Sequence, residues 1–474
     1  LLKLAVEADP DSTRAQAALA SAWLTLGYDR EGRESAKRAL DLATGLPREE
    51  VLFAEARYRE AAKEWDRAIE AYRTLFDFYP DNIEYGLALA NVQSSARKGR
   101  DALATVERLR AMSNDPRVDL AEAEAARTIS DFVRQREAAK RAIRKAEAVG
   151  AKLVIARGYA AIATADRNTN APESSMANAR RALALFQERG DLAGVAAAQN
   201  GIASVEFDRG HLTTAREWWE KMLVTSRTTG DRFGIARGLN NTALAMLHQG
   251  DLAGAEPRYR ETLGIARAIG DNTTIARALN NLAEVPYLRG ELDRALALDE
   301  ESLAVAKSAG DRSLVANVIF DIGDVELARG NLKEARARHD EALAMRRAIG
   351  DLGTSNESLL SLGEIALAEN NAREAERLAR EVGAATKGKR RDNERASLVL
   401  LARALLAQNR RGEAEPVVRA AVAAARDSEN ARVRLSTEVL EAQFARDRGK
   451  LESIAREAEK MGLRLLARDA RAVR

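Results

Sequence analysis

The sequence predicts an all-α protein, a right-handed α-solenoid of about ten or eleven antiparallel helical hairpins. Three observations support this fold class. Glycine–aspartate pairs recur every forty residues, and a second series of glycines lies halfway between them. Only 8 of the 474 residues are proline, as a helical chain requires. Self-similarity at such a period is typical of stacked repeats, in which each unit packs on its neighbours.

The two series of glycines divide the middle of the chain into hairpins. The pairs are Gly190-Asp191, Gly230-Asp231, Gly270-Asp271, Gly310-Asp311 and Gly350-Asp351. The intermediate series is Gly210, Gly250, Gly290 and Gly330, with Asn370 at the fifth position. Aspartate is a favourable N-cap, and glycine readily adopts the left-handed conformation that ends a helix. Each pair therefore predicts the end of one hairpin and the start of the next.

The repeats change in length along the chain. We expect 34-residue repeats over 1–117, the first of them truncated, and degenerate repeats over 118–190. Forty-residue repeats follow over 191–390, and 391–474 holds a C-terminal repeat with capping helices, because a solenoid needs a more polar end unit. The chain starts with Leu1 and with what reads as the end of a helix, so we expect an upstream part to precede it.

Composition narrows the possible functions. Positive and negative residues nearly cancel at +3, whereas a nucleic-acid-binding protein should carry a concentrated basic field. No apolar run is long enough for a membrane span, and no signal peptide opens the chain. Cysteine is absent, which fits the cytoplasm and removes thiolate chemistry. We therefore expect no nucleic-acid and no membrane partner.

Within 49–80 the residues resemble the tetratricopeptide repeat family. Residues of the types and spacing that this family uses are Leu52, Ala56, Ala68, Tyr72 and Pro80. The forty-residue units resemble the longer variant of the family found in kinesin light chains and bacterial regulators, whose first helix often carries the string LNNLA. That string stands at 279–283, with Thr242 replacing its leucine at 239–243. The resemblance implies a curved superhelix that binds protein partners, which differ widely among its members.

No group of residues indicates catalysis. The three histidines, His211, His248 and His339, lie in different units, and the sequence has no HExxH pattern and no phosphate-binding GxxxxGK[ST] loop. We therefore expect no catalytic residue, no metal site and no cofactor.

A ladder of polar residues is the candidate site. Seven residues at related places in successive first helices form it: Asn200, Arg237, Asn240, Arg277, Asn280, Asn317 and Asp324. First helices line the concave wall of a stacked hairpin array, so these side chains should form a polar strip there. Asparagine can hold a peptide's N–H and C=O, and arginine can bind a carboxylate through two hydrogen bonds. Internal duplication alone would also preserve such a ladder, and Asn241 and Asn281 are expected to bond within the stack.

We interpret the chain as a non-catalytic scaffold or sensory module that binds a protein or peptide segment in the concave groove. A similarity of 60–91 and the units after it to large bacterial signalling proteins implies that it forms their regulatory C-terminal part. Two alternatives stay open. The array could be a structural oligomerisation scaffold, or the C-terminal region of a Ser/Thr protein kinase or transcriptional regulator whose active domain lies upstream.

Overall fold

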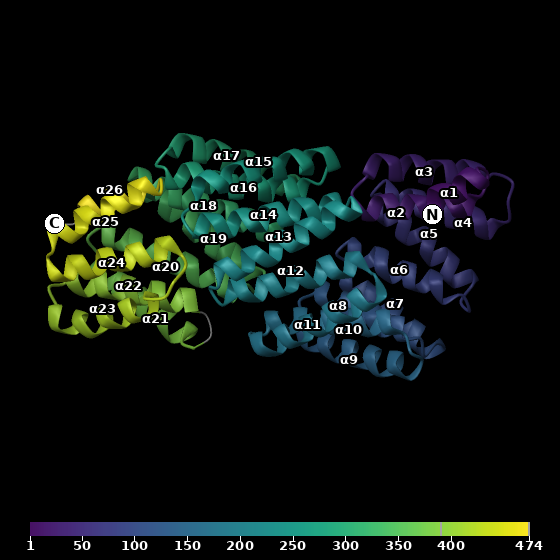
Figure 1. Cartoon of the computed structure of the whole chain (residues 1–474), viewed down its shortest axis with the longest axis horizontal. Coiled ribbons are helices and arrows are strands. Elements are labelled where there is room, and N and C mark those ends of the chain that lie inside the picture. The colour runs from purple at the N-terminus through teal and green to yellow at the C-terminus, as the bar shows by residue number, and fades with distance from the viewer. Residues whose placement is uncertain (389–390, 473–474) are drawn as a thin grey trace. The chain divides into compact units, whose positions relative to one another are not determined.

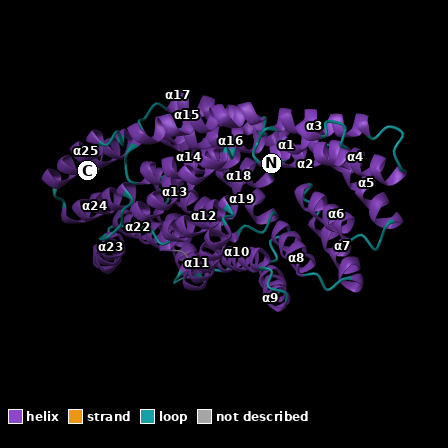
Figure 2. Cartoon of the chain, turned by 45° about the vertical axis from the view of Figure 1, so that its right-hand side comes forward, coloured by secondary structure: helices purple, strands orange, loops and turns teal. Residues whose placement is uncertain are grey.

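The computed structural model describes residues 1–388 and 391–472, and within these ranges every regular element is a helix (Figure 2). The predicted all-α solenoid is confirmed. None of the helices in the described ranges is long and apolar enough to cross a membrane. The limit predicted at 390, between the forty-residue repeats and the C-terminal segment, lies outside the described residues.

The chain forms two compact units (Figure 1). Unit 1 comprises Leu1–Asp208 and Glu217–Gly238, and unit 2 comprises Arg209–Arg216 and Leu239–Arg474. The first thirteen helices are α1 (Leu2–Ala8), α2 (Thr13–Thr25), α3 (Asp29–Leu42), α4 (Arg48–Ala61), α5 (Trp65–Phe78), α6 (Ile83–Ser95), α7 (Gly99–Met112), α8 (Pro116–Thr128), α9 (Phe132–Ala148), α10 (Lys152–Asn168), α11 (Pro172–Arg189), α12 (Leu192–Asp208) and α13 (Leu212–Thr229). The other thirteen are α14 (Arg232–His248), α15 (Leu252–Ile269), α16 (Asn272–Leu288), α17 (Leu292–Ser308), α18 (Arg312–Arg329), α19 (Leu332–Ala348), α20 (Leu352–Ala368), α21 (Ala372–Thr386), α22 (Arg391–Ala407), α23 (Arg411–Ala425), α24 (Ala431–Ala445), α25 (Arg448–Lys460) and α26 (Arg464–Ala472).

Helices α2 to α25 form twelve consecutive hairpins in the described ranges, where the sequence predicts ten or eleven. Each hairpin turns through one residue in the left-handed region, with φ between 56° and 86°. These residues are Gly27, Lys63, Arg97, Ser130, Asn170, Gly210, Gly250, Gly290, Gly330, Asn370, Asn409 and Arg446. A single backbone device thus joins the two helices of every hairpin, whichever side chain occupies the position.

The aspartates of the glycine–aspartate pairs are the N-caps of the first helices, as predicted. Each accepts a hydrogen bond from a backbone N–H two or three residues later, at 2.9–3.2 Å. The capping residues are Asp191, Asp231, Asp271, Asp311 and Asp351. These bonds satisfy N–H groups that the first turn of a helix leaves without an intrahelical partner.

The core of each unit lies between the helices and consists mainly of alanine and leucine. Small residues let the helix backbones approach closely, and a few large side chains fill the wider gaps. Tyr72 and Tyr259 are both fully buried in this way, in second helices of the repeats.

In unit 1 the first complete hairpin contacts the start of α14. The Arg232 backbone N–H donates to the Leu26 carbonyl at 2.9 Å, and the Arg232 guanidinium lies 4.1 Å from the centroid of the Tyr28 ring. The first helices from α2 to α14 therefore follow a path whose two ends meet.

Unit 2 closes in a similar way through its C-terminal helices. One apolar cluster joins residues of α14–α16 to residues of α24–α26, including Leu252, Leu279, Leu435 and Leu463. Polar contacts accompany it, because Arg432 forms an ion pair with Glu284 at 2.9 Å. The last helices thus pack on repeats that precede them by about 180 residues, as the positions of Leu279 and Leu463 show.

Candidate binding cavities

The seven ladder residues are divided between the two units. Asn200 and Arg237 belong to unit 1, and the other five belong to unit 2. In unit 1, Asn200 accepts a hydrogen bond from Trp219 Nε1 at 3.1 Å, within the hairpin α12–α13. Arg237 is exposed and makes no ion pair within the described part of the chain.

In unit 2 the paired asparagines bond to one another. Asn281 Nδ2 donates to Asn240 Oδ1 at 2.8 Å, and Asn240 Nδ2 donates to Asn241 Oδ1 at 3.2 Å. This chain of amides connects α14 to α16. The expectation that Asn241 and Asn281 bond within the stack is confirmed, and Asn240 joins them.

Asn280 holds two carboxyl groups. Its Nδ2 donates to Asp299 Oδ1 at 3.1 Å and to Asp321 Oδ2 at 2.6 Å. Burial, reinforced by the charges of Glu284 and Asp324, raises the pKa of Asp299 to about 8. The pKa of Asp321 is also raised, by burial first and then by the charge of Asp299. The pair therefore retains a proton near neutral pH.

The remaining ladder residues differ in their surroundings. Asn317 Oδ1 accepts a hydrogen bond from Arg346 Nη2 at 3.1 Å. Asp324 Oδ1 lies 3.4 Å from Ser361 Oγ and 3.3 Å from Nε2 of a buried histidine, His339. Arg277 is exposed and has no charged partner in the residues that the structure describes.

A cavity of about 510 Å³ lies inside unit 2. It is lined by the first helices α14, α16, α18, α20 and α22, by Asp299 of α17 and by the start of α24. Its carboxyl groups are Glu284, Asp299, Asp321, Asp324, Glu357 and Asp392. Arg432 supplies the one guanidinium among the described lining residues of this cavity. His248 also lines the cavity, and burial lowers the pKa of its imidazole. The cavity therefore has a strong excess of negative groups.

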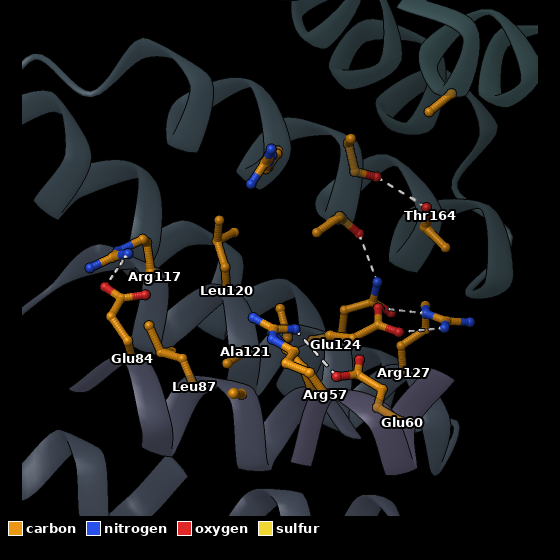
Figure 3. A pocket seen from close by; sticks show the side chains of 18 of the residues that line it. Arg57, Glu60, Glu84, Leu87, Arg117, Leu120, Ala121, Glu124, Arg127 and Thr164 are labelled. Carbon is orange, nitrogen blue, oxygen red and sulfur yellow. Dashed lines mark hydrogen bonds and ion pairs between the residues drawn. The ribbon is translucent and has the colours of Figure 1, made fainter. Parts of the chain in front are cut away.

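Unit 1 holds a cavity of about 760 Å³ with the opposite charge balance (Figure 3). First helices α4 to α14 line it, with Gln135 from α9. Its arginines are Arg57, Arg117, Arg127, Arg157 and Arg237, and its carboxylates are Glu60, Glu84 and Glu124. Three arginines form ion pairs with these glutamates: Arg57 with Glu60 at 3.3 Å, Arg117 with Glu84 at 2.8 Å and Arg127 with Glu124 at 2.5 Å. Two positive charges remain uncompensated.

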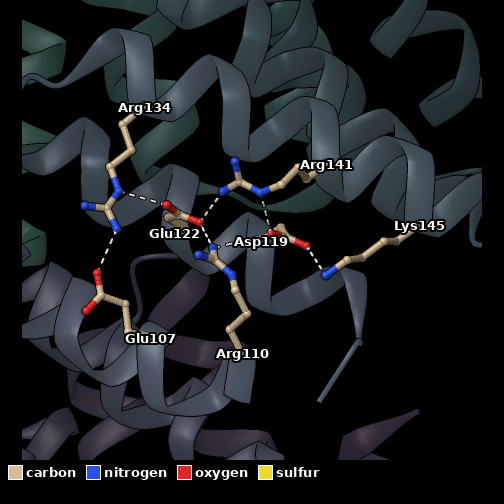
Figure 4. A network of polar contacts seen from close by, with 7 residues as sticks. All are labelled: Glu107, Arg110, Asp119, Glu122, Arg134, Arg141 and Lys145. Atoms are coloured by element: carbon tan, nitrogen blue, oxygen red, sulfur yellow. Dashed lines mark hydrogen bonds and ion pairs between the residues drawn. The ribbon is translucent and has the colours of Figure 1, made fainter. Parts of the chain in front are cut away.

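A buried ion network holds α8, which contributes more residues to this cavity than any other helix (Figure 4). Asp119 and Glu122 are almost fully buried on α8. The cations around them are Arg110 of α7 and Arg134, Arg141 and Lys145 of α9. Lys145 Nζ lies 2.7 Å from Asp119, and Arg134 Nε lies 2.8 Å from Glu122. These contacts fix α8 between its neighbours, so the helix presents Arg117 and Glu124 to the cavity.

The sequence prediction missed part of the unit 1 cavity. Arg117 and Arg157 lie 120 and 80 residues before Arg237, so they occupy the forty-residue register of the ladder. The recurrence of arginine every forty residues is visible in the sequence, but it is interrupted because Ala197 occupies the position between Arg157 and Arg237. The C-terminal residues of the unit 2 cavity, such as Asn430, carried no repeat signal at all.

The described residues contain no group of three or more histidine, cysteine, aspartate or glutamate side chains arranged to hold a metal ion. The charged and amide side chains that line both cavities can form hydrogen bonds and ion pairs with a bound group.

A family model and a solved structure with a TM-score above 0.5 agree with this fold. Residues 274–348 match the family model described as tetratricopeptide repeat. A Rap protein complexed with Competence and Sporulation Factor has a TM-score of 0.53 and 13% identity, over 79% of this chain and 98% of that one. A signal transduction ATPase with a tetratricopeptide repeat sensor, from Pyrococcus horikoshii, gives 0.47 and 15%, over 72% of this chain and 50% of that one. BtubC from P. vanneervenii gives 0.40 and 22%, over 46% and 92%. No curated protein matches the sequence.

Proposed function

Because the chain is a tetratricopeptide-type helical repeat protein, we propose that it is a non-catalytic module that binds a peptide or protein segment between its first helices. The observation that carries this proposal is the unit 2 cavity, which first helices surround and the start of α24 completes. A cavity of about 510 Å³ has the size of an ordinary ligand pocket. It accommodates a few side chains or a chain end, and not a folded partner.

The charge of the unit 2 cavity selects the ligand. Six carboxyl groups face one guanidinium, so a ligand with a cationic group gains charge-assisted hydrogen bonds on entry. Lysine, arginine and a free amino terminus supply such a group. We therefore propose a segment with at least one positive charge, bound beside Asn280 and Asp324.

The other ladder residues have graded roles in this proposal. Arg277 is exposed and free to bind, whereas Asn240 and Asn317 already accept hydrogen bonds from Asn281 and Arg346. In unit 1 the same contrast separates Arg237 from Asn200. We assign ligand contact to Arg237, which lines the unit 1 cavity, and support of the inner wall to the three asparagines. Arg277 does not line the unit 2 cavity and has no assigned role in binding a cationic segment.

The proposal extends to a signalling role in bacteria. The module would form the regulatory part of a signalling protein, such as a Ser/Thr kinase or a transcriptional regulator, and would change that protein's activity when the segment binds. The Rap protein, whose fold is similar at 13% identity, is complexed with Competence and Sporulation Factor. That precedent supports ligand binding by this fold without naming the ligand of this chain.

Fluorescence anisotropy with short labelled peptides tests the proposal. The probes are hexapeptides with one or two lysines and matched peptides with glutamine in their place. We expect the lysine peptides to bind more tightly, and Asp324→Asn or Asp392→Asn to weaken them by about tenfold, the loss typical of a hydrogen bond to a charged group. Asp340→Asn is the control, because Asp340 is exposed on α19 and does not line the cavity.

Two results would contradict the proposal. Equal affinity for lysine and glutamine peptides would remove the charge selection. A stable dimer in light scattering that masks the cavity would favour the oligomerisation scaffold instead. Thermal unfolding of each variant shows whether a loss of binding reflects a loss of folding.

A further inference from the structure

The unit 1 cavity has a feature that distinguishes it from a merely polar surface. Arg157, Ala197 and Arg237 are each the sixth residue of their helices, α10, α12 and α14, and all three line the cavity. The repeat register therefore places two arginines at equivalent positions, with the smallest chiral side chain between them. Ala197 leaves open the space that a third long side chain would fill.

These two arginines are available for binding. Both are exposed, and neither has an ion pair or side-chain hydrogen bond in the described ranges. By contrast, Arg57, Arg117 and Arg127 are each held by a glutamate of the same cavity. A free guanidinium offers five N–H donors in a planar fork that matches a carboxylate.

Part of the cavity wall is apolar. Leu120, Ala121, Ala160 and Ala161 also line the cavity, on α8 and α10. A ligand that contacts this wall as well as the arginines must combine negative groups with apolar ones. Peptides with acidic and aliphatic residues have this combination.

Nucleic acid fits the cavity less well than a peptide does. Its described lining has no aromatic side chain on which a base could stack. Three glutamates face the same space and would repel a continuous phosphate backbone. The net excess of two positive charges suits one or two carboxylates.

The spacing of the helices sets the length of the ligand. Packed helices lie about 8–10 Å apart, so α10 and α14, two repeats apart, are separated by at most about 20 Å at their axes. An extended peptide rises about 3.3 Å per residue. Two acidic residues up to about six positions apart can therefore reach both arginines.

We infer that the unit 1 cavity is a second binding site, specific for an extended peptide or protein segment with two acidic residues, which Arg157 and Arg237 bind on either side of Ala197. This inference rests on the proposed role of the chain as a binding module. It does not depend on the unit 2 cavity or on its preference for a cationic group.

The test uses the full chain and labelled peptides of alanine and leucine in which two glutamates stand two to six positions apart. Glutamine analogues of the same length serve as neutral probes. We expect the glutamate peptides to bind with an affinity that falls as salt rises, and Arg157→Gln and Arg237→Gln each to weaken them by about tenfold or more. Arg180→Gln is the matched control, because Arg180 is an exposed arginine of α11 outside the cavity and should leave binding unchanged.

A second variant keeps both arginines. Ala197→Glu places a carboxylate between them at an exposed position, so it should compete with the ligand and abolish binding of the glutamate peptides while the protein stays folded. Circular dichroism during heating monitors folding. A labelled single-stranded RNA serves as the nucleic-acid probe.

Three outcomes would overturn the inference: equal affinity for glutamate and glutamine peptides, unchanged binding in Arg157→Gln and Arg237→Gln, or tighter binding of the RNA than of any peptide. The lysine peptides separate this inference from the proposed function. If they still bind and respond to Asp324→Asn while the glutamate peptides do not bind, only the unit 1 site is wrong.

Discussion

At the scale of single residues, the carboxyl pair beside Asn280 is the most unusual chemistry in the chain. Two aspartates share one amide donor, and neither has a cation as a direct partner in the described residues. Such a pair holds a proton because two adjacent buried carboxylates cannot both ionise cheaply. A cationic ligand that enters this cavity would take the place of that proton, so binding and proton release should be coupled.

The pair predicts how stability depends on pH. The pKa of an unfolded aspartate is about 3.9, and the folded value for Asp299 is about 8. Between these values the folded chain binds more protons than the unfolded chain, so the free energy of unfolding falls as pH rises. We expect Asp299→Asn to remove part of this decline between pH 5 and 9 in urea unfolding. Parallel declines in the wild type and in Asp299→Asn would contradict the assignment, and Asp340→Asn should follow the wild type.

At the scale of elements, one left-handed residue in each hairpin turn governs the repeat. Five of the twelve turn positions carry glycine and the others carry residues with a Cβ, which is strained in this region. Asparagine tolerates the conformation better than serine, lysine or arginine does. The non-glycine turns therefore store a small amount of strain that the sequence could release.

Ser130 is the clearest place to test this strain. Its φ is 60°, its side chain is exposed, and it forms no side-chain hydrogen bond within the described ranges. We expect Ser130→Gly to stabilise unit 1 by about 0.5–1 kcal/mol, the left-handed penalty less the extra entropy of unfolded glycine. Thermal unfolding measures the change. Asn170→Gly, at a φ of 57°, is the control and should gain less. A loss of stability in Ser130→Gly would show that the turn is not strained.

At the scale of the whole molecule, closure within each unit sets this chain apart from a linear repeat array. In an open solenoid a repeat contacts only its neighbours, and unfolding can start at an end. In unit 2 the apolar cluster that includes Leu252 and Leu463 ties the last helices to α14–α16. The end of the array is thereby protected by contacts between segments far apart in sequence.

This closure makes a long-range prediction. Leu463→Ala removes a buried side chain, 1% exposed, and should cost about 3 kcal/mol. We expect hydrogen exchange to speed up not only in α24–α26 but also in α14–α16. Leu400→Ala is the matched control, since Leu400 is equally buried but packs only with α20–α22. Its effect should stay within neighbouring hairpins. Exchange that changes only beside residue 463 would contradict the closure.

The sequence predicts the fold well because glycine and aspartate mark the forty-residue turns directly. It cannot mark the same turn where Lys63, Arg97 or Ser130 adopts the left-handed conformation, since these residues have no preference for it. The ladder predicts Asn280 and Asp324 as lining residues, which the unit 2 cavity includes. Their binding role stays a prediction. The sequence could not predict the ion pair between Arg432 and Glu284, because this contact depends on the rotation between successive hairpins.

Closure of unit 2 also limits how the array can evolve. An open solenoid tolerates gain or loss of a hairpin, because either change only moves its free end. In unit 2 an added hairpin would separate Arg432 from Glu284, and a lost one would bring the two ends into collision. The number of hairpins therefore sets the size of the binding cavity.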